Sequence, residues 1–148
     1  MAEIYVRCMV LEDIPAVEAM EAELFSDAWS KRSLENTIYY RPDTSFVAEL
    51  DGEIAGYMFF MAAADEGELL RIGVKPECRR GGIGVKLMNH MDEYVSENGI
   101  YSVWLEVREH NIPAQELYKK CGFEMQGYRK HYYRNPDEDA VIMYRNYH

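Results

Sequence analysis

The sequence is poor in cysteine, and its three cysteines lie far apart. Cys8, Cys78 and Cys121 are odd in number, so they cannot all pair, and none belongs to a Cys-x-x-Cys motif of the kind that binds zinc. The four histidines also lack the spacing of metal ligands. The sequence therefore predicts no metal site, and a reduced protein of the cytoplasm fits this cysteine content best.

Long hydrophobic runs are absent as well. No run approaches the roughly 20 apolar residues that a transmembrane helix needs. Residues 1–10 contain no basic segment that leads into an apolar one, so we expect no signal peptide and no membrane partner. Because the 148 residues show no internal repeat, linker or low-complexity segment, we expect a single domain over residues 1–148.

Basic residues are scarce, with 16 Lys and Arg against 26 Asp and Glu, and the net charge is −10. This balance argues against nucleic acid as the partner. The excess of acidic over basic side chains lies in residues 1–70, which hold 15 acidic and 4 basic side chains. Glu21, Glu23 and Asp27 belong to it and predict a surface that attracts a basic partner. The alternative is that these acids only keep the protein soluble.

A glycine-rich turn between a strand and a helix is the most informative stretch. Residues 69–74 predict a short strand, and Ile83, Leu87, Met91 and Val95 predict the buried side of a helix. Between them, Arg79-x-x-Gly82-x-Gly84 presents main-chain N–H groups to an anion at the N-terminus of that helix. The turn lacks the Lys-Ser/Thr of a nucleotide P-loop and the third glycine of a dinucleotide site. A phosphate site and a simple turn both remain open.

Hydrophobic periodicity and turn residues predict the other elements. Ser30 can cap a helix that reaches Tyr40, and Asp13 can cap the helix before it. Asn111 opens the last helix and Gly122 ends it. The predicted helices cover residues 14–24, 31–40, 83–97 and 112–121, and the predicted strands cover residues 4–8, 45–50, 53–61, 69–74, 101–108, 123–134 and 140–147.

This order of elements, with its Arg-x-x-Gly-x-Gly turn, resembles the GNAT superfamily of acetyl-CoA-dependent N-acetyltransferases. Several motifs resemble the RimI-type protein N-terminal acetyltransferases: Trp29-Ser30, Glu106 within WLEVR, Asn111-x-x-Ala114-x-x-Leu117-Tyr118, and Tyr132-Tyr133. These bacterial enzymes acetylate the N-terminal alanine of a small-subunit ribosomal protein. Ala28, Arg71 and Cys78 depart from the usual pattern, and the first two departures concern the acceptor side.

The resemblance implies an α/β (α+β) GNAT fold. Its central sheet is mixed, mostly antiparallel and seven-stranded, with four flanking helices and a separation between strands four and five. Acetyl-CoA is then expected between these strands and at the glycine-rich turn, without a metal. The implied cofactor-binding residues are Ile72, Gly73, Val74, Arg79, Arg80, Gly81, Gly82, Ile83, Gly84, Asn111 and Tyr118. Ile72 and Val74 can equally be sheet core, and Asn111 can be only a helix cap.

Two residues are candidates for proton transfer. Glu106 is the candidate general base and lies on the strand face opposite Val103, Leu105 and Val107. Tyr118 is the candidate acid, because a phenol with a pKa near 10 gives up its proton only as the thiolate, with a thiol pKa near 8.5, develops. The alternatives are a solvated strand glutamate and a core tyrosine.

The resemblance implies an acceptor site that includes Trp29, Glu106, Tyr132 and Tyr133, although each aromatic residue can instead be packing. The expected activity is direct acetyl transfer, in a ternary complex, to the α-amine of a basic protein N-terminus, the N-terminal alanine of a ribosomal protein. No cysteine is placed like an activated nucleophile. One alternative is a GNAT enzyme that acetylates a polyamine or an amino acid. Another is a CoA-binding module without activity, against which Glu106 and Tyr118 count.

Overall fold

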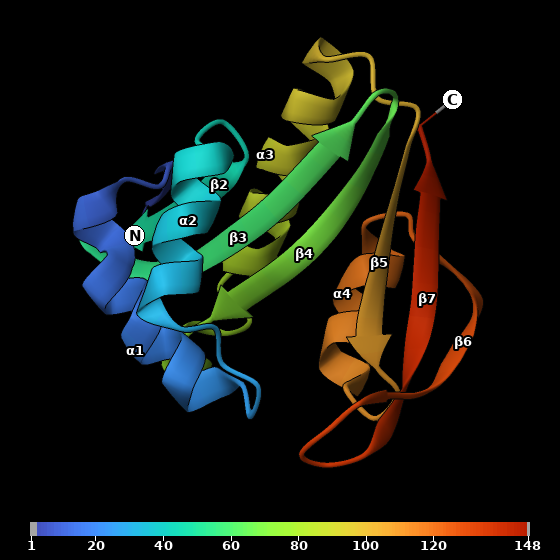
Figure 1. The fold of residues 1–148 in the computed structure, drawn as a ribbon. Coiled ribbons are helices and arrows are strands. Elements are labelled where there is room, and N and C mark those ends of the chain that lie inside the picture. Colours follow the sequence, from blue (N-terminus) through green and yellow to red (C-terminus); the bar gives the residue numbers. More distant parts are fainter. Residues whose placement is uncertain (1–2, 148) are drawn as a thin grey trace.

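A seven-stranded sheet with helices on both faces forms the protein (Figure 1). The computed structural model describes residues 3–147, so the ends of the predicted domain, residues 1, 2 and 148, lie outside it. The strands are β1 (Ile4–Cys8), β2 (Ser45–Leu50), β3 (Glu53–Ala63), β4 (Glu66–Val74), β5 (Ser102–Arg108), β6 (Glu124–Tyr133) and β7 (Glu138–Asn146). The helices are α1 (Ile14–Leu24), α2 (Lys31–Tyr40), α3 (Ile83–Glu97) and α4 (Ile112–Lys120), with short 3₁₀ turns at Leu11–Asp13 and Pro76–Cys78.

The strand order is β1-β2-β3-β4-β5-β7-β6, and every neighbouring pair is antiparallel except β4 and β5. The parallel pairing of β4 with β5 extends only from Glu66 opposite Ser102 to Leu69 opposite Leu105. Beyond these residues the two strands diverge, and the gap between them widens toward their C-terminal ends (Figure 1). The predicted mixed sheet, with its separation between strands four and five, is thus confirmed.

Two apolar cores lie on opposite faces of the sheet. The larger one packs α3 and α4 against the sheet, and the predicted stripe Ile83, Leu87, Met91 and Val95 is at most 2% exposed. The smaller core contains Ile14, Val17 and Met20 of α1 and Leu34 and Ile38 of α2. Leu24, predicted for the same stripe, is only partly buried. Helices α1 and α2 therefore cover one face of the sheet, and α3 and α4 cover the other.

A β-bulge lies in β4 where the strands begin to separate. Leu69 is opposite Phe60 and Arg71 is opposite Phe59, so Leu70 is an extra residue in the β3–β4 ladder. The bulge shifts the alternation of side chains along the strand. As a result Glu68 and Arg71, three residues apart, both face the side of the sheet that α1 and α2 cover, while Leu69 faces the larger core.

The predicted helix starts have different outcomes. Ser30 caps α2 as predicted, because its Oγ accepts a 3.1 Å hydrogen bond from the Ser33 N–H. Asp13 occupies the N-cap position of α1 as predicted, but its side chain makes no capping hydrogen bond to that helix. A 3₁₀ turn leads directly into α1, so Asp13 already has helical backbone angles, and its carboxylate accepts from the Val10 N–H and from Arg7. The β4 strand also begins three residues earlier than predicted, since it continues the hairpin with β3.

Candidate active site

A cavity of about 1520 Å³ opens where β4 and β5 diverge. Segments that are far apart in the sequence form its walls, namely β4, the start of α3, the end of β5, α4, the α1–α2 connection and the β6–β7 hairpin. Of the predicted site residues, all but Gly81 line it: Trp29, Ile72, Gly73, Val74, Arg79, Arg80, Gly82, Ile83, Gly84, Glu106, Asn111, Tyr118, Tyr132 and Tyr133. The structure therefore brings the cofactor and acceptor candidates into one space.

The β4 wall offers main-chain N–H groups to the cavity. The Lys75 N–H donates a 2.9 Å hydrogen bond to the Ala55 carbonyl on β3. Because N–H groups alternate along an antiparallel ladder, those of Ile72 and Val74 point away from β3 and into the gap. The side chains of Ile72 and Val74 pack against the larger core. The interpretation of these side chains as sheet core is confirmed, and the cofactor role of the N–H groups stays a prediction.

The start of α3 provides further N–H groups. Gly82 is the N-cap residue and has a left-handed φ of 88°. The Lys86 N–H donates to the Gly82 carbonyl, which leaves the N–H groups of the first turn without intrahelical acceptors. A Cβ atom on Gly84 would lie 3.0 Å from the Leu117 side chain, so glycine also permits close packing against α4. A helix end with these properties suits a pyrophosphate, and Arg79 and Arg80 precede it.

Helix α4 carries the other two predicted residues of the cofactor side. Asn111 caps the helix, with its Oδ1 accepting a 3.3 Å hydrogen bond from the Ala114 N–H. Tyr118 is 6% exposed, and its ring centroid lies 6.2 Å from that of Phe123. Burial raises the pKa of the Tyr118 phenol above its ordinary value near 10, and nearby Tyr133 adds to the effect. The phenol therefore keeps its proton throughout the neutral range and can act only as an acid there.

Glu106 is buried rather than solvated. Its side chain is 8% exposed and forms an ion pair with Arg129 of β6. Its Oε2 atom is buried and, among residues 3–147, has no hydrogen bond of ordinary geometry besides this ion pair. Burial and a hydrogen bond to Glu106 raise the pKa of Tyr132. The alternative of a solvated strand glutamate is therefore wrong. The sequence analysis missed Arg129, which is opposite Ala140 of β7 and reaches diagonally to Glu106, whose own neighbour on β7 is Ile142.

A buried ion pair attaches the α1–α2 connection to β4. Glu21 is 0% exposed and accepts hydrogen bonds from Arg71 at 3.0 and 3.1 Å, from the Tyr57 hydroxyl at 2.5 Å and from the Trp29 N–H at 2.9 Å. Burial and the bond to Glu21 raise the pKa of Tyr57. The prediction that Glu21 belongs to an acidic surface is wrong. Asp27, 3.3 Å from Arg71, is partly neutralised by the same cation.

Arg71 also holds the chain between Glu21 and Trp29 in place. Its guanidinium lies 3.8 Å from the ring centroid of Phe25 and donates a 3.0 Å hydrogen bond to the Asp27 carbonyl. Trp29 packs 5.1 Å from Phe59, centroid to centroid, and still lines the cavity. Phe25, Asp27 and Trp29 of this segment form one wall of the cavity.

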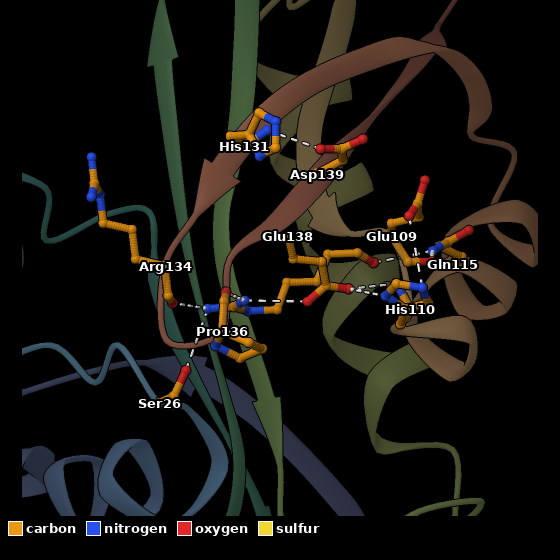
Figure 2. A network of polar contacts seen from close by, with 10 residues as sticks. Ser26, Glu109, His110, Gln115, His131, Arg134, Pro136, Glu138 and Asp139 are labelled. Carbon is orange, nitrogen blue, oxygen red and sulfur yellow. Dashed lines mark hydrogen bonds and ion pairs between the residues drawn. The ribbon is translucent and has the colours of Figure 1, made fainter.

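The opposite wall depends on Arg108, which the sequence analysis also did not single out. Arg108 donates hydrogen bonds to the carbonyls of Arg134 (2.9 Å) and Pro136 (3.0 Å). It also donates to Glu138 (3.2 Å) and to the Ser26 hydroxyl (3.3 Å). Its guanidinium lies 4.5 Å from the Tyr133 ring centroid. Figure 2 shows the hydrogen-bond partners Ser26, Arg134, Pro136 and Glu138 together with His110, whose ring and N–H both bind Glu138. Arg108 thus connects the β6–β7 hairpin to the α1–α2 connection.

The profile of the acetyltransferase (GNAT) family matches residues 14–123. The chain belongs to this family. Among curated proteins, the [ribosomal protein bS18]-alanine N-acetyltransferase of Escherichia coli (strain K12) is 32% identical over 133 residues, which cover 88% of this chain and 89% of that protein. A protein of Bacillus subtilis (strain 168) that is provisionally assigned the same activity is 39% identical over 140 residues, 94% and 93% of the two chains.

Solved structures of GNAT proteins have the same fold. The ribosomal-protein-S18-alanine N-acetyltransferase from Escherichia coli superposes with a TM-score of 0.87 at 28% identity, covering 97% of this chain and 94% of the other. Ard1 from Thermoplasma volcanium superposes with a TM-score of 0.91 at 25% identity and 97% coverage of both chains. This GNAT protein is an acetyl-CoA-dependent N-acetyltransferase.

The observed site fits acetyl-CoA. Main-chain N–H groups face the gap beside β4, and others without intrahelical acceptors lie at the glycine-bearing start of α3, an arrangement of the kind that binds phosphate. Residues 3–147 contain no group of three or more His, Cys, Asp or Glu side chains placed to hold a metal. In the same range, no helix is both long and apolar enough to cross a bilayer.

Substitution of Gly82 by aspartate is expected to raise the dissociation constant for acetyl-CoA about tenfold or more. The new carboxylate would repel the pyrophosphate and compete for the same N–H groups, and helix-end interactions with a charge reach about 2 kcal/mol. Calorimetric titration with acetyl-CoA measures the effect. Gly52→Asp is the matched control, because Gly52 has a similar left-handed φ of 82° in the β2–β3 turn, away from the cavity. Equal affinities in the two variants would place the cofactor elsewhere.

Proposed function

We propose that this enzyme transfers acetyl from acetyl-CoA to the N-terminal α-amine of a protein in the cytoplasm. Its proposed acceptor is a basic N-terminus that begins with alanine, as in a small-subunit ribosomal protein. One observation carries this proposal. The cavity continues past Glu106 between two walls, the α1–α2 connection and the β6–β7 hairpin, to exposed residues such as Tyr132, which is 49% exposed. A chain end can enter such a space, whereas an enclosed pocket would admit only a small molecule.

The names of the relatives support the same acceptor, since the Escherichia coli protein is a ribosomal protein bS18-alanine N-acetyltransferase. Trp29 and the segment before it form one proposed wall for the peptide, and Tyr132 and Tyr133 form the other. The aromatic rings can hold the first residues of an extended peptide at little entropic cost, because each has only two side-chain torsions.

The proposed chemistry is direct attack in a ternary complex. Glu106 accepts a proton from the α-ammonium, whose reference pKa of about 7.7–8.0 makes a carboxylate base adequate when a water relays the proton. The neutral amine then attacks the thioester carbon. The N–H groups of Ile72 and Val74 face the gap in which the carbonyl oxygen becomes an oxyanion. Tyr118, protonated because burial raises the pKa of its phenol, supplies a proton to the departing thiolate. Its phenolate is then reprotonated by the second proton, which the nitrogen loses as the amide forms.

A basic peptide that begins with alanine is expected to be acetylated at its α-amine with a kcat/KM at least tenfold above that for spermidine. The peptide backbone can contact both walls, while a polyamine offers only charges. Mass spectrometry of the peptide with its α-amine free or blocked, run beside spermidine, measures the preference. Raising the ionic strength should lower the rate, because the net charge of −10 favours encounter with a basic peptide.

The sequence predicted an acidic surface that includes Glu21 and Asp27. The salt effect should be smaller than such a surface would cause, because Glu21 is buried and Asp27 is paired with Arg71. If spermidine is the better acceptor, or if acetyl is found only on lysine side chains, the proposal of an N-terminal acceptor fails. The family and the fold do not depend on this result.

A further inference from the structure

A second carboxylate, Glu68, lies in the cavity beside Glu106. Glu68 is a partly buried residue of β4, and it lines the cavity. Its position before the bulge directs it to the face of the sheet that α1 and α2 cover. Glu106 occupies the same face of β5, opposite Val103, Leu105 and Val107. No described residue donates a hydrogen bond to the Glu68 carboxylate or forms an ion pair with it, unlike Glu106.

The register of the two strands brings these carboxylates together. Glu68 is opposite Trp104 and Leu69 is opposite Leu105, so Glu106 follows immediately after the last paired position. Both groups therefore lie where the strands begin to diverge. The pKa of Glu68 is raised, first by burial and then by the negative charge of Glu106, while the positive charge of Arg129 lowers it. Glu68, Glu106 and Arg129 thus form one group of interacting charges.

The charges of this group do not balance. Two carboxylates face a single guanidinium, which leaves a formal excess of one negative charge. Two other arginines near the cavity already have partners, since Arg71 binds Glu21 and Asp27, and Arg108 binds Glu138. One further cation with N–H donors would balance this excess, and an α-ammonium is such a group.

We propose that Glu68 is a second acceptor-binding carboxylate, which forms an ion pair with the α-ammonium of the incoming N-terminus while Arg129 neutralises Glu106. This inference rests on the proposed function, because it assumes that an α-amine enters beside Glu106. The proton balance explains why two carboxylates are useful. When the ammonium loses a proton to Glu106, the amine and Glu106 both become neutral, and Arg129 loses its partner. Glu68 remains ionised and becomes the counterion of Arg129, so the charges cancel before and after the transfer.

The test compares Glu68→Gln with Glu66→Gln. Glu66 lies two residues earlier in β4, is exposed and does not line the cavity, so the control makes the same change of charge on the same strand. Two peptides are titrated by calorimetry into the enzyme bound to CoA. One is a basic peptide that begins with alanine, and the other has a propionyl group in place of the alanine and therefore lacks the ammonium. The wild type is expected to bind the peptide with the free amine about tenfold more tightly.

Glu68→Gln is expected to remove most of this difference, leaving the affinity for the propionyl peptide unchanged, whereas Glu66→Gln is expected to keep the difference. In turnover, Glu68→Gln should raise the KM for the peptide about tenfold and leave the KM for acetyl-CoA unaltered. A Glu68→Gln enzyme that retains the full difference overturns the inference, as does equal weakening of both peptides, which would indicate a structural role. Because the titration needs no turnover, its result is separate from the finding of which amine is acetylated.

Discussion

Glu106→Gln is expected to lower kcat for an α-amine acceptor about 10²–10⁴-fold at neutral pH, the range for loss of a general base. The amide has nearly the shape of the carboxylate and cannot take the proton. It also leaves Glu68 as the counterion of Arg129, so no excess negative charge remains at the point where the ammonium would enter. Binding of the ammonium should therefore weaken as well, and both effects act on the acceptor rather than on acetyl-CoA.

Steady-state kinetics with a basic peptide beginning with alanine measures this loss, and calorimetry checks that the affinity for acetyl-CoA stays within about twofold of wild type. Glu109→Gln is the matched control. Glu109 follows the same strand closely but does not line the cavity, so its variant should retain wild-type kcat. A Glu106→Gln enzyme with wild-type kcat and an unchanged pH–rate profile would remove Glu106 from the mechanism.

Arg71→Met is expected to lower the free energy of unfolding by about 3–5 kcal/mol, the usual cost of removing one partner of a buried ion pair. The substitution leaves the Glu21 carboxylate, 0% exposed, with hydrogen bonds from Tyr57 and Trp29 but without a cation. The segment from Phe25 to Trp29 also loses its attachment to β4. We therefore expect weaker acceptor binding in addition to lower stability.

Urea denaturation measures the stability, and Arg32→Met, at an exposed position of α2, is the control that should change it by less than about 0.5 kcal/mol. A double variant, Glu21→Leu with Arg71→Met, should recover part of the loss because no charge is left buried. If Arg71→Met alone costs less than about 1 kcal/mol, water or another group must satisfy Glu21, and the ion pair does not hold this wall.

The fold was predictable wherever local patterns decide it. The stripe from Ile83 to Val95 and the cap at Ser30 need only residues within one helix, and both predictions are confirmed. The separation of β4 from β5 came instead from the resemblance to a family, since no local pattern reports how far two strands remain paired. Asp13 shows a limit of local patterns, because a cap residue and a residue of a preceding 3₁₀ turn have the same sequence signal.

In the candidate site, too, residues that are close in sequence were predictable, and residues that only the fold brings together were not. The glycine-rich turn and the strand before it are contiguous, so the residues proposed for the cofactor, apart from Asn111 and Tyr118, could be named from one stretch of sequence. Glu21 follows Val17 by four residues and thus continues the buried stripe of α1, but its partner Arg71 is 50 residues away. Glu68 and Arg129 become candidates only when the bulge in β4 and the register of β6 with β7 are known.

The two sides of the cavity also differ in the kind of atoms that they present. The β4–α3 side offers main-chain N–H groups, which any residue except proline retains when its side chain is replaced. The acceptor side offers side chains from three separate segments, such as Trp29, Glu68 and Tyr132. Substitutions at these positions can therefore alter which amine is accepted, while the N–H groups of the β4–α3 side remain unchanged. Single substitutions can therefore change the acceptor preference without any change in the β4–α3 side of the cavity, which is proposed to bind the thioester.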